Sequence, residues 1–199
     1  MDIRYAKDTI TFSEKHLTLL DRFVLGFIHV LEPHTQYVIV SGYVAILFGR
    51  SRGTEDVDIL VPQLEKETFR DLHAALLVTG YEFLNAEGAD GLYEMLVSRM
   101  GIRIARTDQF IPNIELKFLK DDVDRCVLRD RVEVKLSDAK VFISPIEIQI
   151  AYKLYLGSEK DIEDALYLFE IFKNDMDQQN LKAWMKKFGV RGDEYGIGI

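Results

Sequence analysis

The sequence predicts an α/β fold, in which a mixed β-sheet is flanked by helices and followed by a helical C-terminal part. Three observations lead to this prediction. Short apolar runs of strand length recur through residues 1–143, and segments with helical periodicity separate them. Residues 144–199 then contain helical patterns alone. We therefore expect an α/β domain over residues 1–143 and a helical region over residues 144–199 that packs against it.

The composition is that of a globular protein. The 199 residues are 48% hydrophobic and 29% charged, so the chain can bury a sizeable core. No apolar run approaches the ~20 residues of a membrane span. Residues 1–4 lack the basic-then-apolar layout of a signal peptide. A single cysteine, Cys126, excludes an internal disulfide. These features predict a cytoplasmic protein that does not enter a membrane.

The formal net charge of -8 argues against broad nucleic-acid binding, which depends on basic surfaces. A local basic groove stays open as an alternative. Two groups of basic residues lie close together in the sequence: Arg99, Arg103 and Arg106, and Lys182, Lys186 and Lys187.

Residues 37–61 carry the strongest functional signal. An apolar run over residues 38–40 ends in Ser41-Gly42, and a helix-like segment and a polar loop follow. The stretch closes on Asp56-Val57-Asp58 and a second apolar run. Side chains alternate along a strand, so Asp56 and Asp58 project to the same side. Two adjacent carboxylates repel each other unless a cation lies between them, and hard divalent ions fit best. The glycine turn leaves backbone open to a phosphate.

This stretch resembles the nucleotidyltransferase superfamily, in which a small-residue turn is followed by Asp-x-Asp on the next strand. The run from Arg52 to Asp58 is similar, more narrowly, to the AbiEii-like abortive-infection branch, where Arg-x-Thr-x-Asp-x-Asp recurs. One departure is Tyr43. The superfamily usually has a small residue or threonine there, so we expect this bulky side chain to hinder close approach of a phosphate.

The resemblance implies transfer of a nucleoside monophosphate from an NTP to an acceptor hydroxyl. Asp56 and Asp58 then hold two Mg²⁺ (or Mn²⁺) ions roughly 3.5–4 Å apart. A third carboxylate completes the metal site or acts as the base, and Glu115 is the best candidate, with Asp108 as the fallback. Residues implied to bind the nucleotide are Ser41 and Gly42, which cradle the triphosphate, together with Arg52, Thr54, Lys153 and Lys160.

The N-terminal half predicts further elements in order. Ser13 is a good N-cap for a helix that ends at Pro33, with apolar residues at helical spacing between them. An amphipathic helix is expected over residues 64–77, stopped by Gly80. Strands are expected over residues 81–84 and 102–106, whereas residues 92–100 fit a helix or a strand equally well.

Residues 113–119 alternate as a strand, with Glu115 and Lys117 on one side and apolar residues on the other. An alternative to the catalytic role is that Glu115 simply pairs with Lys117 or with an arginine on a neighbouring strand. A helix over residues 121–130 follows. Two strands, over residues 132–136 and 140–143, are joined by a turn that begins at Ser137.

The C-terminal part begins at Ser144-Pro145, a strong helix start that is followed by Glu147. This helix runs to Gly157, and Ser158 starts the next. The AbiEii-like branch has a lysine on one helix and Lys-Asp-x-x-Asp at the next, and this chain matches with Lys153, Lys160, Asp161 and Asp164. Helix capping explains the acidic residues equally well. A last helix carries Leu181, Trp184 and Phe188, with Trp184 expected in the core.

Two other functions stay open at this point. Some proteins with this fold have lost catalysis and act as toxin or antitoxin partners, so the acidic surface could meet a basic protein partner. The plainest alternative is an α/β protein with no nucleotide site. If the chain is an enzyme, the acceptor remains open between RNA, a protein side chain and a small molecule.

Overall fold

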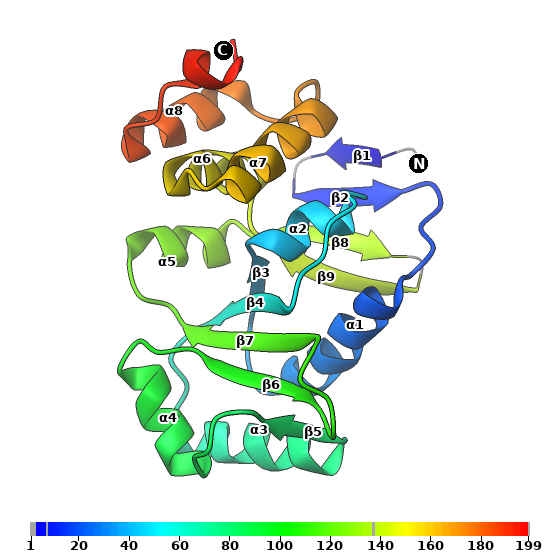
Figure 1. Ribbon diagram of the computed structural model, residues 1–199, viewed down its shortest axis with the longest axis vertical. Helices are drawn as coiled ribbons and strands as arrows, with labels where there is room; N and C mark the ends of the chain where they lie inside the picture. Colours follow the sequence, from blue (N-terminus) through cyan, green and yellow to red (C-terminus); the bar gives the residue numbers. More distant parts are fainter. Residues whose placement is uncertain (1–2, 7, 137, 199) are drawn as a thin grey trace.

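A computed structural model describes residues 3–6, 8–136 and 138–198 of the chain. Within these residues nine strands form one mixed sheet, in the order β1-β2-β8-β9-β3-β4-β7-β6-β5. The pairs β2–β8, β3–β9 and β4–β7 are parallel and the others antiparallel. Helices α6, α7 and α8 gather at one end of the molecule, and α3 and α4 lie at the other (Figure 1). The predicted α/β class with a helical C-terminal part is confirmed.

The bounds of the elements follow chain order. The strands are β1 (Ile3–Ala6), β2 (Thr9–Phe12), β3 (Val38–Val40), β4 (Asp56–Val61), β5 (Tyr81–Phe83), β6 (Ile102–Arg106), β7 (Asn113–Phe118), β8 (Val132–Leu136) and β9 (Ala139–Ile143). The helices are α1 (Leu19–Leu31), α2 (Gly42–Leu47), α3 (Lys66–Val78), α4 (Ala89–Val97), α5 (Asp122–Arg129), α6 (Ile146–Leu156), α7 (Glu159–Phe172) and α8 (Gln178–Phe188), and a 3₁₀ turn covers Gly192–Tyr195.

The N-terminal region departs from the sequence prediction in two ways. An antiparallel pair, β1 and β2, forms before the first helix, where no individual strand was predicted. The first helix begins at Leu19, and its N-cap is Thr18 rather than Ser13. The Thr18 side chain accepts from the backbone N–H of Asp21, whose carboxylate accepts from the N–H of Thr18. This reciprocal pair satisfies two N–H groups at once and fixes the start of the helix five residues later than predicted.

The central stretch folds as its sequence predicts. Strand β3, the turn at Ser41, helix α2 and strand β4 follow one another, and β4 lies between β3 and β7. Val57 and Ile59 are fully buried in the main core. The opposite face of β4 contributes Leu60 to a smaller apolar cluster with residues of β3, α5 and α6. One face of β4 is therefore core, and the other can carry polar side chains.

The ambiguous segment near residue 92 is helical, since α4 covers Ala89–Val97 and buries Leu92 and Leu96. The predicted stop of α3 is also confirmed, because Gly80 has a φ of 81°, which favours glycine. The predicted turn between β8 and β9 begins at Ser137, which lies outside the described residues, as do Met1 and Asp2 of the N-terminal stretch.

Helix α6 forms the centre of the C-terminal part and is buried on almost all sides. Its first residue is Ile146, and Ser144 does not cap it. The Ser144 hydroxyl instead donates to the side chain of Gln149. Gly157 ends the helix in the left-handed conformation, and Ser158 caps α7 as predicted. Trp184 is half-buried against both apolar clusters rather than fully in the core. Among the described residues, no helix is both long and apolar enough to cross a membrane.

Candidate active site

The carboxylate pair lies on the polar face of β4. Asp56 and Asp58 occupy alternate positions of the strand, and both are half-buried. The parallel pairing with β7 sets Asp58 directly opposite Glu115. Side chains at paired positions of adjacent strands point to the same side of a sheet. The register thus places the predicted third carboxylate beside the pair.

A lysine ammonium occupies the space between two of these carboxylates. Lys117 Nζ lies 2.8 Å from Oδ1 of Asp58 and 2.9 Å from Oε2 of Glu115. Burial lowers the pKa of Lys117, but the two carboxylates raise it by more, so it stays above its usual value and the amine stays charged. The alternative in which Glu115 pairs with Lys117 is therefore the arrangement that the structure shows. Within the described part of the chain, no group of three or more His, Cys, Asp or Glu side chains is arranged to hold a metal ion.

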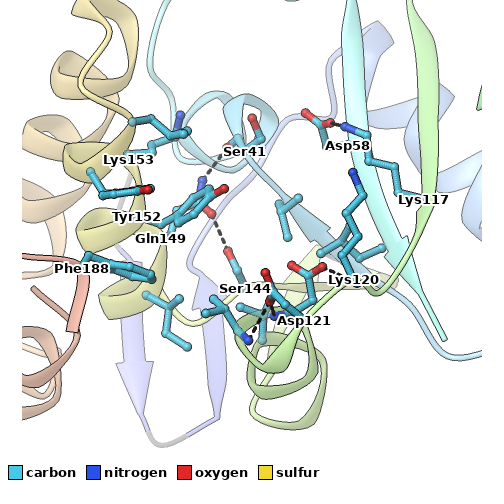
Figure 2. A pocket seen from close by; sticks show the side chains of 18 residues that line it. Ser41, Asp58, Lys117, Lys120, Asp121, Ser144, Gln149, Tyr152, Lys153 and Phe188 are labelled. Atoms are coloured by element: carbon cyan, nitrogen blue, oxygen red, sulfur yellow. Dashed lines mark hydrogen bonds and ion pairs between the residues drawn. The ribbon is translucent and has the colours of Figure 1, made fainter. Parts of the chain in front are cut away.

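A cavity of about 530 Å³ opens beside this ion pair. Figure 2 shows Asp58 and Lys117 on one side of it and Tyr152 and Phe188 across from them. Strands β3, β4 and β7 form one wall, and helices α5, α6 and α8 form the others. Asp56 shares a strand face with Asp58 but does not line the cavity itself.

The two sides of the cavity differ in chemistry. Near β3, the side chain of Gln149 donates to the Ser41 carbonyl (2.7 Å) and accepts from the Ser144 hydroxyl (2.7 Å). Farther from the strands the wall is aromatic. The ring centroids of Tyr152 and Phe188 are 5.5 Å apart, and Tyr152 is 42% exposed. The cavity thus combines polar groups at the strand ends with an aromatic surface on the helices.

The turn between β3 and α2 holds an unusual backbone conformation. Ser41 has a φ of 65°, a value that L-residues rarely adopt. Tyr43 does not obstruct the turn, contrary to our expectation. Its side chain is fully buried and donates to Oδ1 of Asp21 at 2.7 Å. Its ring therefore belongs to the core and not to the surface that a phosphate would approach.

Gly42 is covered by a guanidinium rather than open. A Cβ built on Gly42 would come within 2.0 Å of Nη2 of Arg52. The same guanidinium binds the Asp164 carboxylate through Nε (3.0 Å) and Nη2 (2.9 Å). The missing side chain at position 42 thus lets Arg52 cross the turn and reach helix α7.

Asp164 is the centre of a buried charge network. Its carboxylate is fully buried and binds Arg50, Arg52 and Lys153, the last at 2.8 Å. Lys153 also lies 2.8 Å from Asp161, whose backbone N–H donates to the Ser158 hydroxyl that caps α7. Burial lowers the pKa of Lys153 more than its acidic partners raise it. The network joins the loop before β4 to helices α6 and α7.

The predicted site residues form two groups in the structure. Asp58 and Glu115 meet at Lys117, and Glu115 does not line the cavity. Lys153, Asp161 and Asp164 converge in the second group. Among the described residues, none forms an ion pair with the Lys160 side chain, and its backbone carbonyl accepts from Arg50. Asp108 does not line the cavity, and its N–H donates to Glu82.

Thr54 has a local role. Its hydroxyl donates to the carbonyl of Asp56 at 2.8 Å, so it shapes the loop that leads into β4. Sequence reasoning missed Arg50 and the central position of Lys117. The alternation of β7 placed Lys117 on the same side as Glu115, but only the register with β4 brings it to Asp58.

Comparisons with solved structures place the fold. A solution structure of the antibiotic-resistance factor ANT(2'')-Ia aligns with 88% of this chain and 92% of its own, at 13% identity and a TM-score of 0.54. A crystal structure of ANT(2'')-Ia in complex with adenylyl-2''-tobramycin aligns with 86% of this chain and 98% of its own, at 14% identity and a TM-score of 0.55.

A nucleotidyltransferase-like protein from Paracoccidioides brasiliensis aligns with 87% of this chain and 89% of its own, at 17% identity and a TM-score of 0.51. No protein-family model matches the chain, and neither does any curated protein. Sequence identities this low show a shared fold, and they do not show a shared activity or substrate. By its strand order, its flanking helices and these similarities, the chain has a nucleotidyltransferase-like fold.

Proposed function

We propose that this protein is a metal-dependent nucleotidyltransferase, which moves a nucleoside monophosphate from an NTP to an acceptor hydroxyl. The observation that carries the proposal is the position of Asp58. It lines a cavity of about 530 Å³ together with Ser41, and it shares a strand face with Asp56. That volume lies within the range of small-molecule sites, roughly 300–1,000 Å³.

In the proposed reaction, the acceptor oxygen forms a bond to the α-phosphorus of the NTP. The bond from that phosphorus to the oxygen bridging to the β-phosphorus breaks, and pyrophosphate leaves with the electron pair. The hydroxyl proton passes to a base. Glu115 is the proposed residue for that step or for a third oxygen ligand, because it lies directly across from Asp58.

The carboxylate pair fits a divalent cation. Mg²⁺ is commonly bound through one or two carboxylates together with substrate phosphates, and it keeps several waters. Asp56 and Asp58 supply such a pair on one strand face. When bound, Mg²⁺ or Mn²⁺ neutralises charge on the triphosphate and on the leaving pyrophosphate.

The remaining roles are assigned to side chains near the turn. Ser41 and Gly42 are proposed to position the phosphates, together with Arg52, whose guanidinium lies over Gly42. Lys153 lines the cavity and is proposed to counter charge on the leaving group. Three further residues support this arrangement, since they order the loop before β4 and the start of α7: Thr54, Asp161 and Asp164. Lys160 is a weaker candidate, because its side chain is exposed.

The acceptor and the branch of the superfamily belong to this proposal as well. ANT(2'')-Ia has been solved with adenylyl-2''-tobramycin, which supports a hydroxyl of a small molecule as one acceptor class. RNA and protein side chains are the other classes. The convergence of Lys153, Asp161 and Asp164 supports the AbiEii-like branch, and the single cysteine supports a cytoplasmic location.

A second function is a catalytically inactive partner of another protein, such as an antitoxin-like partner. The Lys117 ammonium favours it, because the protein itself already neutralises part of the carboxylate charge. Co-purification of a tight, stoichiometric partner, with no nucleotide binding, is the outcome that supports this function over catalysis.

Thermal melts with each NTP, with and without Mg²⁺ or Mn²⁺, test the proposed enzyme. A ligand at a concentration 100 times its dissociation constant adds about 2.7 kcal/mol to the free energy of unfolding. For a chain of this size, that is a rise in Tm of roughly 5–10 °C. We expect the rise to depend on the metal and to vanish in Asp58→Ala, which should also abolish transfer while it stays folded. No shift with any NTP, or full activity in Asp58→Ala, refutes the proposal.

A further inference from the structure

The position of Lys117 is the clearest difference between this site and a site built for two metal ions. Two-metal nucleotidyl transfer uses two divalent ions to bind the attacking and leaving oxygens. Here an ammonium already bridges Asp58 and Glu115, at 2.8 and 2.9 Å. These are two of the three carboxylates that a two-metal site would use as ligands.

We propose that Lys117 takes the place of one of the two divalent ions, so that the site works with a single ion held by Asp56 and Asp58. Of the two roles given to Glu115 above, this excludes the third metal ligand, because Glu115 then positions Lys117. The inference rests on the proposed nucleotidyl transfer and specifies how the charge of that site is supplied.

The strand that carries Lys117 fixes its position. Strand β7 is hydrogen-bonded on both sides, to β4 and to β6. Its neighbours Leu116 and Phe118 are buried in the core on the opposite face. The Lys117 side chain is only 22% exposed. The ammonium is therefore held by a rigid element and not by a surface loop.

Glu115 is also restricted. A Cβ built on Gly101 would lie 2.5 Å from Oε1 of Glu115, so the glycine leaves the space that this carboxylate fills. With one oxygen against Gly101 and the other on Lys117, Glu115 has little room to turn toward a metal ion. Packing thus favours its role as the partner of Lys117.

The charges agree with a single ion. Asp56, Asp58 and Glu115 carry three negative charges and Lys117 one positive charge, which leaves a net charge of −2. One divalent cation neutralises these four side chains, so Lys117 supplies positive charge that a second ion would otherwise supply. The ammonium also lines the cavity, where it can donate to phosphate oxygens of a bound NTP.

Counting bound Mn²⁺ by electron paramagnetic resonance tests the inference. The protein is saturated with an NTP analogue whose α–β bridging oxygen is a methylene group, so that no transfer occurs. We expect one bound Mn²⁺ per wild-type protein, and two in Lys117→Met, because Asp58 and Glu115 are then left without a cation. Glu115→Gln should keep one ion. A matched control is Lys140→Met, because Lys140 also pairs with a strand carboxylate, Glu133, but lies outside this cavity. It should keep one ion too.

The other outcomes would contradict the inference. Two Mn²⁺ ions in the wild type would overturn the inference and leave the proposed transfer standing. One ion in both the wild type and Lys117→Met would show that Lys117 does not stand at a cation site. Failure of the analogue itself to bind, measured by calorimetry on the same samples, would refute the proposed function and the inference with it.

Discussion

Gly42 and Arg52 are in such close contact that position 42 has no room for a side chain. A Cβ there would lie 2.0 Å from Nη2 of the arginine, which in turn binds the buried Asp164 of α7. Gly42 is therefore needed for packing within the protein, in addition to any role that it has in ligand binding. It lets a cation from the loop before β4 cross to the C-terminal helices.

Gly42→Ala should displace the Arg52 guanidinium and weaken its bond to Asp164. We expect a loss of about 1–3 kcal/mol in the free energy of unfolding, as is typical when a group is forced into a packed site. Urea unfolding measures it. Gly53→Ala is the matched control, in the loop that carries Arg52, because a Cβ there meets nothing within 4 Å. Equal stability of the two variants would contradict this account of Gly42.

Asp164→Asn should be far more damaging than a change at its neighbour Glu163. The Asp164 carboxylate is fully buried among three cations, so its loss leaves buried positive charge uncompensated, at a cost of about 3–5 kcal/mol. Glu163 also pairs with Arg50, but its side chain is 56% exposed, so Glu163→Gln should cost at most about 1 kcal/mol. Denaturant unfolding of both variants makes the comparison, and similar losses would show that burial is not what matters.

The local pattern of the sequence predicted the fold well where one period dominates. Strand β4 and helix α3 have clear alternation or amphipathic spacing, and both formed as expected. The predicted start of α1 was wrong because Ser13 and Thr18 are both good N-caps by residue type. The decisive signal was the acidic residue three positions after Thr18, which completes the reciprocal cap.

The candidate site was harder to predict because it depends on strand register. Alternation placed Glu115 and Lys117 on one face of β7, but no local pattern says which residue of β4 lies opposite. The parallel pairing of Asp58 with Glu115 creates the ion pair with Lys117. Arg50 was missed for a similar reason, since its partner Asp164 is more than a hundred residues away in the chain.

Glu147→Gln should stabilise the protein in a pH-dependent way. Burial raises the pKa of Glu147 above its usual value of 4.5, although its carboxylate accepts from the N–H of Asp177 at the start of α8. A raised pKa means that the protonated side chain favours the folded state. This contribution is full below pH 4.5 and is lost as the pH rises through the folded-state pKa. Glutamine keeps an acceptor for Asp177 and carries no charge at any pH.

We therefore expect Glu147→Gln to have a higher Tm than the wild type at pH 7 and the same Tm as the wild type below pH 4.5. Melting curves across this range give the result. Glu170→Gln is the control, because Glu170 is 71% exposed on α7 and should give no such gain. A gain that is the same at both pH values would show that the charge of Glu147 is not its cause.

The aromatic wall of the cavity should contribute to nucleotide affinity. Tyr152 and Phe188 face Asp58 across the cavity (Figure 2), which suits a base stacked on their rings while its phosphates reach β4. Stacking of one base on aromatic side chains contributes about 1–3 kcal/mol, so Tyr152→Leu or Phe188→Leu should weaken NTP binding by roughly 5- to 150-fold. Calorimetry with the non-reacting analogue measures this loss. Phe110→Leu is a matched control, because Phe110 is 77% exposed and does not line the cavity. Unchanged affinity in both cavity variants, with folding intact, would show that the base does not bind against this aromatic wall.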